Sequence, residues 1–207
     1  MRLLELFCGF KSVSTIACSM GYECISLDIN PKFNPDICMD IMEFNPKCYP
    51  RNYFDCIWAS PECKIWSIVQ NSLIGRKWES LDELNEERKH HVKFVEKTLE
   101  IIQYFSPAKW FIENPFSSKM KTLDCLQGFN FYVYDYCQYN DGAYKKPTII
   151  WTNRTDLQSN RCKCKTHTKW DYIERGTDMT RLQCRYHIPA NLIRYLLSDN
   201  IYLETHK

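Results

Sequence analysis

The sequence contains no long hydrophobic run. No apolar stretch approaches the ~20 residues that a membrane-spanning helix requires, so an association with membranes is not expected. The amino terminus leads directly into a strand-like segment and lacks the architecture of a secretory signal. Internal repeats and low-complexity tracts are absent as well. The 207 residues are therefore expected to form one domain with a hydrophobic core of ordinary size.

The chain also has little net charge, only +2 at neutral pH, but the charge is unevenly distributed. Residues 1–139 carry 15 Lys/Arg against 18 Asp/Glu, whereas residues 140–207 carry 12 against 7. A basic carboxyl-terminal third suits a polyanionic partner such as a nucleic acid. An ordinary solvated basic surface would explain the same charges.

Cysteine, in contrast, is abundant, with 12 residues. Because no secretory signal precedes them, these cysteines argue for reduced thiols, a metal site or catalysis rather than for a disulfide framework. The expected location is a reducing intracellular compartment, either cytoplasm or nucleus.

Short apolar runs alternate with segments of helical periodicity. Strands are expected at residues 2–7, 24–27, 54–59, 110–112, 131–136 and 148–151, and helices from 12 to about 20 and at 92–105, 118–126 and 190–197. This order predicts an α/β fold with a mostly parallel sheet. Ser12 or Ser14 is expected to cap the first helix and Gly21 to close it. Asp40 and Ile41 suggest a short edge element. Residues 64–90 are expected to form a long loop or a helical lid. His90 and His91, at the end of this region, are expected to be solvated.

Three of these strands are followed by turns that carry polar groups: residues 8–9, 60–63 and 113–115. Carboxyl ends of parallel strands share one edge of the sheet, which is where open α/β folds bind ligands. Cys63 and Glu113 are expected to meet there as nucleophile and acid, although most cysteines are simply small buried side chains. Asp28 follows Gly9 by 19 positions, close to the spacing at which a carboxylate holds a nucleotide ribose.

Together, the ordered segments resemble one enzyme family. They are residues 4–9 (LELFCG), 26–29 (SLDI), 40–41 (DI), 55–63 (DCIWASPEC), 110–115 (WFIENP), 136–139 (YCQY), 144–148 (YKKPT) and 150–153 (IWTN), with a weaker match at 185–189 (RYHIP). In this order they are similar to the motifs of the cytosine carbon-5 DNA methyltransferases, most closely the compact phage and large-virus branch. A phage- or virus-encoded protein is therefore expected.

The resemblance implies a Rossmann-like fold that binds S-adenosylmethionine and methylates carbon 5 of cytosine in DNA, on a base flipped out of the duplex. It implies that Cys63 is the nucleophile, with Glu113 and Asn114 as the other catalytic residues. It assigns Lys145 and Lys146 to substrate binding, although an exposed turn would explain them too. The cofactor contacts that it implies are Phe7, Cys8, Gly9, Ser12, Asp28, Ile29, Asp40, Ile41, Ser60 and Pro61.

The sequence departs from the family pattern at three turns. Glu62 stands immediately before the nucleophile, where the family has proline; proline fixes φ, whereas a carboxylate disfavours the thiolate. The turn at residues 9–11 lacks a second glycine, and residues 140–143 replace a shorter glycine turn. Two alternatives therefore remain beside the DNA methyltransferase: the same chemistry on RNA or a free cytosine nucleotide, and a catalytically impaired nucleic-acid-binding protein.

The carboxyl-terminal third suggests a three-part organisation. Residues 1–153 form the expected catalytic core, residues 154–187 a short basic insert in place of a target-recognition domain, and residues 188–207 a helix that packs back on the core. A separate partner protein could supply the missing recognition. The insert offers five candidate ligands for one tetrahedral structural zinc, the alternative being reduced cysteines in a basic loop; they are Cys162, Cys164, His167, Cys184 and His187.

Overall fold

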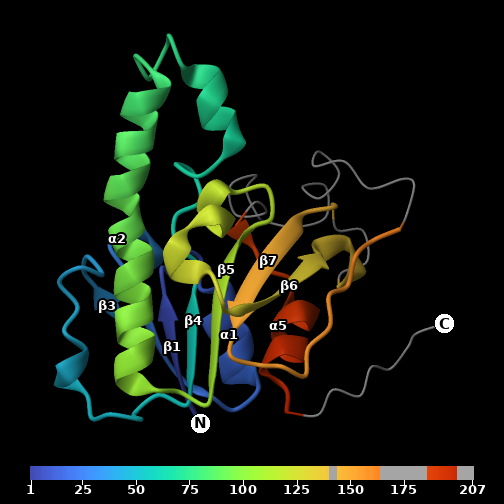
Figure 1. Ribbon diagram of the computed structural model, residues 1–207. Coiled ribbons are helices and arrows are strands. Elements are labelled where there is room, and N and C mark those ends of the chain that lie inside the picture. Colours follow the sequence, from blue (N-terminus) through green and yellow to red (C-terminus); the bar gives the residue numbers. More distant parts are fainter. Residues whose placement is uncertain (140–143, 164–185, 200–207) are drawn as a thin grey trace.

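The computed structural model describes residues 1–139, 144–163 and 186–199. Its centre is a seven-stranded sheet of order β3-β2-β1-β4-β5-β7-β6 (Figure 1). Strands β1 to β5 run parallel, whereas β7 is antiparallel to β5 and β6 to β7. The predicted α/β fold with a mostly parallel sheet is confirmed. The strands are β1 (Arg2–Leu6), β2 (Glu23–Asp28), β3 (Ile37–Cys38), β4 (Cys56–Ala59), β5 (Lys109–Pro115), β6 (Asn130–Asp135) and β7 (Pro147–Thr152).

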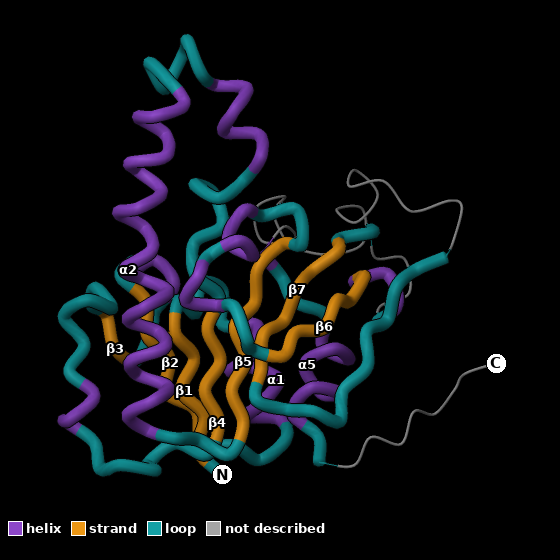
Figure 2. The backbone as a smooth tube through the Cα atoms, viewed as in Figure 1, coloured by secondary structure: helices purple, strands orange, loops and turns teal. Residues whose placement is uncertain are grey.

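Helices cover both faces of the sheet, as the ribbon and the backbone tube show (Figures 1 and 2). α2 (Leu81–Phe105) lies on one face, and α1 (Ser12–Ser19) and α5 (Ala190–Leu197) lie on the other. Successive strand residues point to opposite faces. Leu4 and Ile57 therefore belong to the core under α2, and Leu3 and Trp58 belong to the core under α1 and α5. Within the described ranges, no helix is both long and apolar enough to cross a bilayer.

The start of α1 differs from the prediction. Neither Ser12 nor Ser14 caps the helix: the N-cap is Lys11, whose backbone is left-handed (φ 55°) and whose side chain makes no capping hydrogen bond. The buried carboxylate of Glu5 on β1 serves instead, because it accepts hydrogen bonds from the backbone N–H groups of Val13 (3.4 Å) and Ser14 (2.8 Å). The helix ends as expected, with Gly21 at φ 86°.

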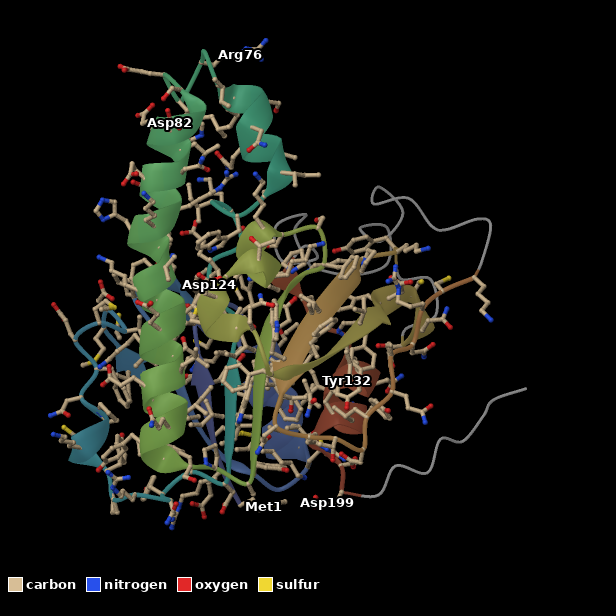
Figure 3. All side chains as sticks on the ribbon, viewed as in Figure 1. Met1, Arg76, Asp82, Asp124, Tyr132 and Asp199 are labelled. Atoms are coloured by element: carbon tan, nitrogen blue, oxygen red, sulfur yellow. The ribbon has the colours of Figure 1, made fainter. Side chains whose placement is uncertain are left out.

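Residues 64–90, expected to form a long loop or a helical lid, are partly helical. α2 begins at Leu81, eleven residues before the helix predicted at 92, and the Ser80 hydroxyl caps it by accepting from the Glu83 N–H at 3.1 Å. A 3₁₀ segment, η3 (Ile68–Leu73), precedes it. The first half of α2 and the segment before it project beyond the carboxyl edge of the sheet, with Arg76 and Asp82 near the tip (Figure 3).

Three other expectations need correction. The edge element is β3 at Ile37–Cys38, and Asp40 and Ile41 follow it in a turn. Residues 113–115 are not a turn but the last residues of β5, because β7 continues to pair with them beyond the end of β4. Residues 118–126 form two 3₁₀ turns, η4 (Lys119–Thr122) and η5 (Asp124–Leu126), because Leu123 between them is extended. The remaining 3₁₀ turns are η1 (Pro31–Phe33), η2 (Pro46–Cys48) and η6 (Tyr136–Gln138).

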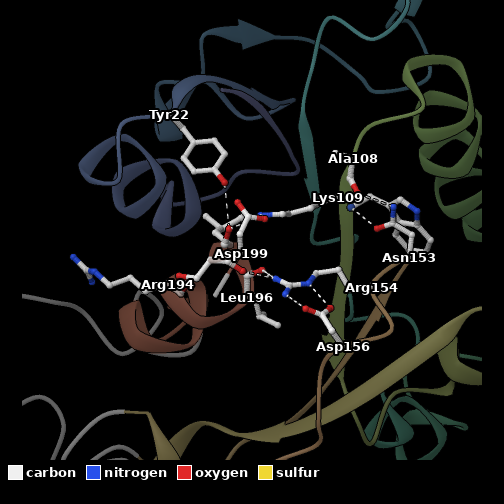
Figure 4. Close-up of polar contacts among 12 residues, drawn as sticks. Tyr22, Ala108, Lys109, Asn153, Arg154, Asp156, Arg194, Leu196 and Asp199 are labelled. Atoms are coloured by element: carbon white, nitrogen blue, oxygen red, sulfur yellow. Dashed lines mark hydrogen bonds and ion pairs between the residues drawn. The ribbon is translucent and has the colours of Figure 1, made fainter. Parts of the chain in front are cut away.

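α5 occupies the predicted residues and is tied to the core at its carboxyl end (Figure 4). The Arg154 guanidinium donates to the Leu196 carbonyl at 2.8 Å, and Lys109 Nζ donates to the Leu197 carbonyl at 2.8 Å. The Tyr22 hydroxyl donates to the same Leu197 carbonyl at 3.3 Å. Carbonyl groups at a helix end have no intrahelical partner, so these side chains satisfy them and hold α5 against β5 and α1.

Candidate functional site

The turn after β1 has an unusual backbone. Phe7, Gly9 and Lys11 all have φ near +50° (57°, 48° and 55°), a region that bulky side chains rarely adopt. Both oxygens of the Asp28 carboxylate at the end of β2 accept backbone hydrogen bonds, from Gly9 at 3.0 Å and from Asn30 at 2.9 Å. A Cβ added at Gly9 would meet nothing within 4 Å. The turn is therefore pinned to β2 while leaving open space over Gly9.

A hollow lies at the carboxyl edge next to this turn, where the sheet order reverses between β1 and β4. Six of the ten cofactor residues expected from the sequence line it: Phe7, Asp28, Ile29, Asp40, Ile41 and Pro61. The other four do not line it: Cys8, Gly9 and Ser60 lie in the turns around it, and Ser12 is the first residue of α1. Of these, Cys8 is buried, and Ser60 accepts a hydrogen bond from Trp58 Nε1 at 3.1 Å.

The composition of this hollow fits an adenosine group. Its lining is mostly apolar and aromatic, and it includes Asp28 and Asp40, whose carboxylates can accept hydrogen bonds from hydroxyl or amino groups. Each Asp28 oxygen already accepts one backbone N–H and keeps a further lone pair for a ligand. The residues present therefore suit S-adenosylmethionine.

The segment that carries Cys63 leaves β4 and passes beside the end of β5. The two segments are joined by one buried hydrogen bond, in which Asn114 Nδ2 donates to the Pro61 carbonyl at 3.0 Å. Asn114 is fully buried, and its other amide atom, Oδ1, has no hydrogen-bond partner among the described residues. The residue before Glu62 and Cys63 is thus fixed to the strand that also carries Glu113.

Charged groups around Cys63 influence its ionisation in opposite directions. Burial raises the pKa of the Cys63 thiol, the Glu113 carboxylate raises it further, and the Lys146 ammonium lowers it. Glu113 is buried and accepts a hydrogen bond from the Tyr136 hydroxyl at 3.2 Å. The fold therefore brings Cys63 close to Glu113, the meeting expected from the sequence, and close to Lys146, which was expected only as a substrate-binding residue.

The side chain of Glu62 turns toward α2. One of its oxygens lies 3.8 Å from Nε2 of His91, and Nδ1 of that ring lies 2.9 Å from the Glu87 carbonyl oxygen. The His91 side chain is only 19% exposed, so the prediction that it is solvated was wrong. Glu62 and His91 both line the hollow.

The two candidate substrate lysines have different surroundings. Lys145 is directed to the buried Asp135 carboxylate (4.0 Å) and to the Cys162 carbonyl (3.4 Å). Lys146 lies over the ring of Tyr136, with Nζ 4.8 Å from the ring centroid. Of the two lysines, Lys146 is the one whose charge lowers the pKa of the Cys63 thiol.

The zinc prediction falls mostly outside the described residues, because Cys164, His167 and Cys184 lie there. Cys162 is buried beside Cys137, and burial together with this neighbour raises the pKa of Cys137 to about 11. Burial and the nearby Lys146 lower the pKa of His187. In the described parts of the chain no group of three potential ligands could hold a metal ion.

Sequence reasoning missed several residues of the site: Trp66, His91 and Phe94 in the hollow, Tyr136 behind Glu113, and Glu5 under α1. Two signals were available. Ser80 and Glu83 have the spacing of a capping box, which predicts a helix from residue 81 and places His91 and Phe94 on one face. Glu5 is a carboxylate inside an otherwise apolar strand. Tyr136 belongs to the motif at residues 136–139, but nothing in that motif marked it as the partner of Glu113.

Comparison with known proteins decides the family. The chain is 30% identical over 218 residues to a protein of frog virus 3 (isolate Goorha) that is named "Probable DNA (cytosine-5)-methyltransferase", and the match covers 95% of this chain and 99% of the relative. This chain belongs to the DNA (cytosine-5)-methyltransferase family. The resemblance found in the motifs is thereby confirmed, and S-adenosylmethionine is the cofactor of this family. No protein-family model matches the sequence.

Solved structures support the fold of this methyltransferase-family chain. The Entamoeba histolytica methyltransferase EhMeth aligns with a TM-score of 0.53 at 13% identity, over 86% of this chain and 61% of that one. The S. pombe Dnmt2 methyltransferase aligns with a TM-score of 0.50 at 16% identity, over 86% and 60% respectively. This chain therefore spans about three-fifths of each of these structures, and the likeness establishes the Rossmann-like fold.

Proposed function

We propose that this protein transfers a methyl group from S-adenosylmethionine to carbon 5 of cytosine in DNA. The observation that carries the proposal is the meeting of Cys63 and Glu113 beside the hollow, with the Asn114–Pro61 hydrogen bond holding the two segments together. The 30% identity to the viral relative, which extends over 99% of that protein, supports the same activity.

The chemistry explains why these residue types are needed. Carbon 5 of cytosine is a poor nucleophile until the thiolate of Cys63 adds to carbon 6 and produces an enamine. Glu113, as the acid, gives a proton to the ring N3 and accepts a hydrogen bond from the exocyclic amino group, so it neutralises the negative charge that develops in the ring during this attack, and the proton returns to Glu113 when the ring is restored. After methyl transfer the proton on carbon 5 leaves, and elimination breaks the bond from Cys63 to carbon 6 and restores the ring.

The hollow is the proposed cofactor site. In this proposal Asp28 would hold the ribose hydroxyls, Asp40 with Ile41 would contact the adenine, and Phe7 and Gly9 would line the methionine side; Phe7, Asp28, Asp40 and Ile41 all line the hollow, which supports it. When bound there, the cofactor supplies an electrophilic methyl group. The chain's own residues bind it, exclude water and present Cys63 to the flipped base.

The test is transfer of labelled methyl groups to duplex DNA, single-stranded DNA, RNA and free cytosine nucleotides, with product nucleosides identified by mass spectrometry. We expect 5-methyldeoxycytidine from DNA, and none from a Cys63→Ser variant that still binds the cofactor. Full activity in Cys63→Ser would contradict the nucleophile assignment. Cofactor binding without transfer to any substrate would support an impaired, nucleic-acid-binding protein instead.

Three narrower points are part of the proposal. The ten described cysteines are all free thiols, which supports a reducing intracellular compartment. A partner protein is proposed to contribute target recognition, and activity that appears only with host or viral extract would support it. Metal analysis of the purified protein tests whether residues 154–187 hold one zinc ion.

A further inference from the structure

Tyr136 stands directly behind the proposed catalytic carboxylate. It is 2% exposed, it follows β6 at the start of η6, and its hydroxyl donates to Glu113 Oε1 at 3.2 Å. Among the described residues it is the only hydrogen-bond donor to that carboxylate, so Glu113 Oε2 receives none from them. One oxygen of Glu113 is thus held by the protein, and the other is left for a ligand.

Tyr136 is itself held on two further sides. Its backbone N–H donates to the Lys146 carbonyl at 3.3 Å, and the Lys146 ammonium lies 4.8 Å from the centroid of its ring. Burial and the adjacent Glu113 carboxylate raise the pKa of Tyr136 well above its usual value, so the hydroxyl keeps its proton at any working pH. Tyr136 is therefore a fixed and permanent donor that connects Glu113 on β5 with the segment leading into β7.

We propose that Tyr136 is a positioning residue for the methyl transfer: by occupying Oε1 it fixes the rotation of the Glu113 carboxyl group, so that Oε2 faces the cytosine ring. This inference rests on the proposed function. A carboxylate can rotate about its last side-chain torsion, which is broad and nearly two-fold. A single buried donor at one oxygen removes that freedom before the base arrives, and preorganised groups stabilise developing charge most effectively.

The chain offers a matched control two residues earlier. Tyr134 is also fully buried, lies on β6, and packs its ring against Tyr139 and Tyr195. Its hydroxyl has no hydrogen-bond partner among the described residues. Tyr134→Phe therefore removes a buried tyrosine hydroxyl, as Tyr136→Phe does, but leaves the hydrogen bond to Glu113 in place.

The experiment compares Tyr136→Phe with Tyr134→Phe and the unmodified chain in methyl transfer to duplex DNA. We expect Tyr136→Phe to lower kcat by about 10- to 100-fold, which is about 1.4–2.7 kcal/mol of transition-state stabilisation, because Glu113 is then no longer held in one orientation. The KM for DNA and the dissociation constant of the cofactor should change less than about twofold, since Glu113 acts chiefly in the transition state. Tyr134→Phe should keep the unmodified kcat. Equal kcat values for all three proteins would overturn the proposal, as would equal losses in both variants.

A second measurement does not depend on turnover. A double-mutant cycle of Tyr136→Phe and Glu113→Ala, read by urea unfolding, tests the contact itself, because each substitution removes one of its two partners. A coupling between the two substitutions supports the proposal, and additive effects overturn it. If the unmodified chain and Tyr134→Phe both fail to transfer methyl groups while the cycle shows coupling, the proposed function has failed and the Tyr136–Glu113 contact has not.

Discussion

One carboxylate oxygen of Glu62 lies 3.8 Å from Nε2 of His91 on α2, a contact that is an ion pair when His91 is protonated. Nδ1 of the same ring lies 2.9 Å from the Glu87 carbonyl oxygen. The contact directs the carboxylate toward α2, and it gives the segment before Cys63 a tether where the family has a proline.

We predict that this tether replaces the constraint of proline. His91→Ala should lower the methyl-transfer rate about two- to fivefold, the range expected for a partly exposed ion pair. In a Glu62→Pro background the same His91→Ala change should have little effect, because proline fixes φ without help from α2. The measurement is the initial transfer rate of the four proteins at saturating cofactor.

The outcome that contradicts this prediction is an equal loss in both backgrounds. His91 would then act on the cofactor directly through the wall of the hollow that it lines. Cofactor affinity measured by calorimetry separates the two cases, since the tether alone leaves that affinity unchanged.

Much of the sheet edge could be predicted because the sequence encodes it locally. Apolar runs ending at Leu6, Ala59 and near Glu113 identify buried strands, and parallel strands bring their carboxyl ends together. The Gly9-to-Asp28 spacing predicted a carboxylate that holds a ribose; the structure places Asp28 Oδ2 3.0 Å from Gly9 N, and the ribose contact stays a prediction. These relationships depend on chain order, which the sequence shows directly.

The rest depends on contacts between distant segments. β5 continues through Glu113 to Pro115 because these residues pair with β7. No local sequence pattern reveals this pairing. The local sequence around His91 is that of a polar, solvated helix. Its contact is with Glu62, 29 positions earlier in the chain, and only the fold brings the two together. Tyr136 gains its significance only because Glu113 lies within hydrogen-bond distance of its hydroxyl.

We predict that Asn114 is needed to hold the nucleophile segment. Asn114→Ala removes the donor to the Pro61 carbonyl, and leaving a buried carbonyl unpaired costs about 1–3 kcal/mol. Both the free energy of unfolding and the transfer rate should fall. Asn153→Ala is the matched control, because its Nδ2 donates to the Ala108 carbonyl at 3.0 Å near the opposite end of β5 (Figure 4). That variant should lose stability but keep its transfer rate per folded molecule; a normal rate in Asn114→Ala would refute the prediction.

We predict that methyl transfer accelerates with rising pH. Burial and the Glu113 carboxylate raise the pKa of Cys63, so the nucleophilic thiolate is a small fraction at neutral pH and grows as the pH rises. Single-turnover rates should therefore increase from about pH 7 to pH 9. Alkylation by iodoacetamide, followed peptide by peptide, gives an independent measure: Cys63 should react more slowly than the exposed Cys48. A flat pH profile together with fast alkylation of Cys63 would mean that the thiolate is already present at neutral pH.

Glu5 predicts how stability depends on pH. Burial raises its pKa to about 7 in the folded protein, against 4.5 for a free side chain, although the N–H groups of Val13 and Ser14 stabilise the charged form. A carboxyl whose pKa is higher in the folded state binds more protons there than in the unfolded chain. Its contribution to stability is therefore complete below pH 4.5 and is lost as the pH rises through 7. The loss amounts to roughly 3 kcal/mol, at 1.36 kcal/mol for each pKa unit.

The comparison that tests this is urea unfolding of the unmodified chain and Glu5→Gln at several pH values from 5 to 8. Glutamine keeps an acceptor oxygen for the Ser14 N–H but does not titrate, so the stability of the unmodified chain should fall relative to the variant across this range. Parallel curves would show that Glu5 has the same pKa folded and unfolded. In that case the hydrogen bonds at the start of α1 would offset the burial of the carboxylate, and Glu5 would hold α1 as an anion throughout this pH range.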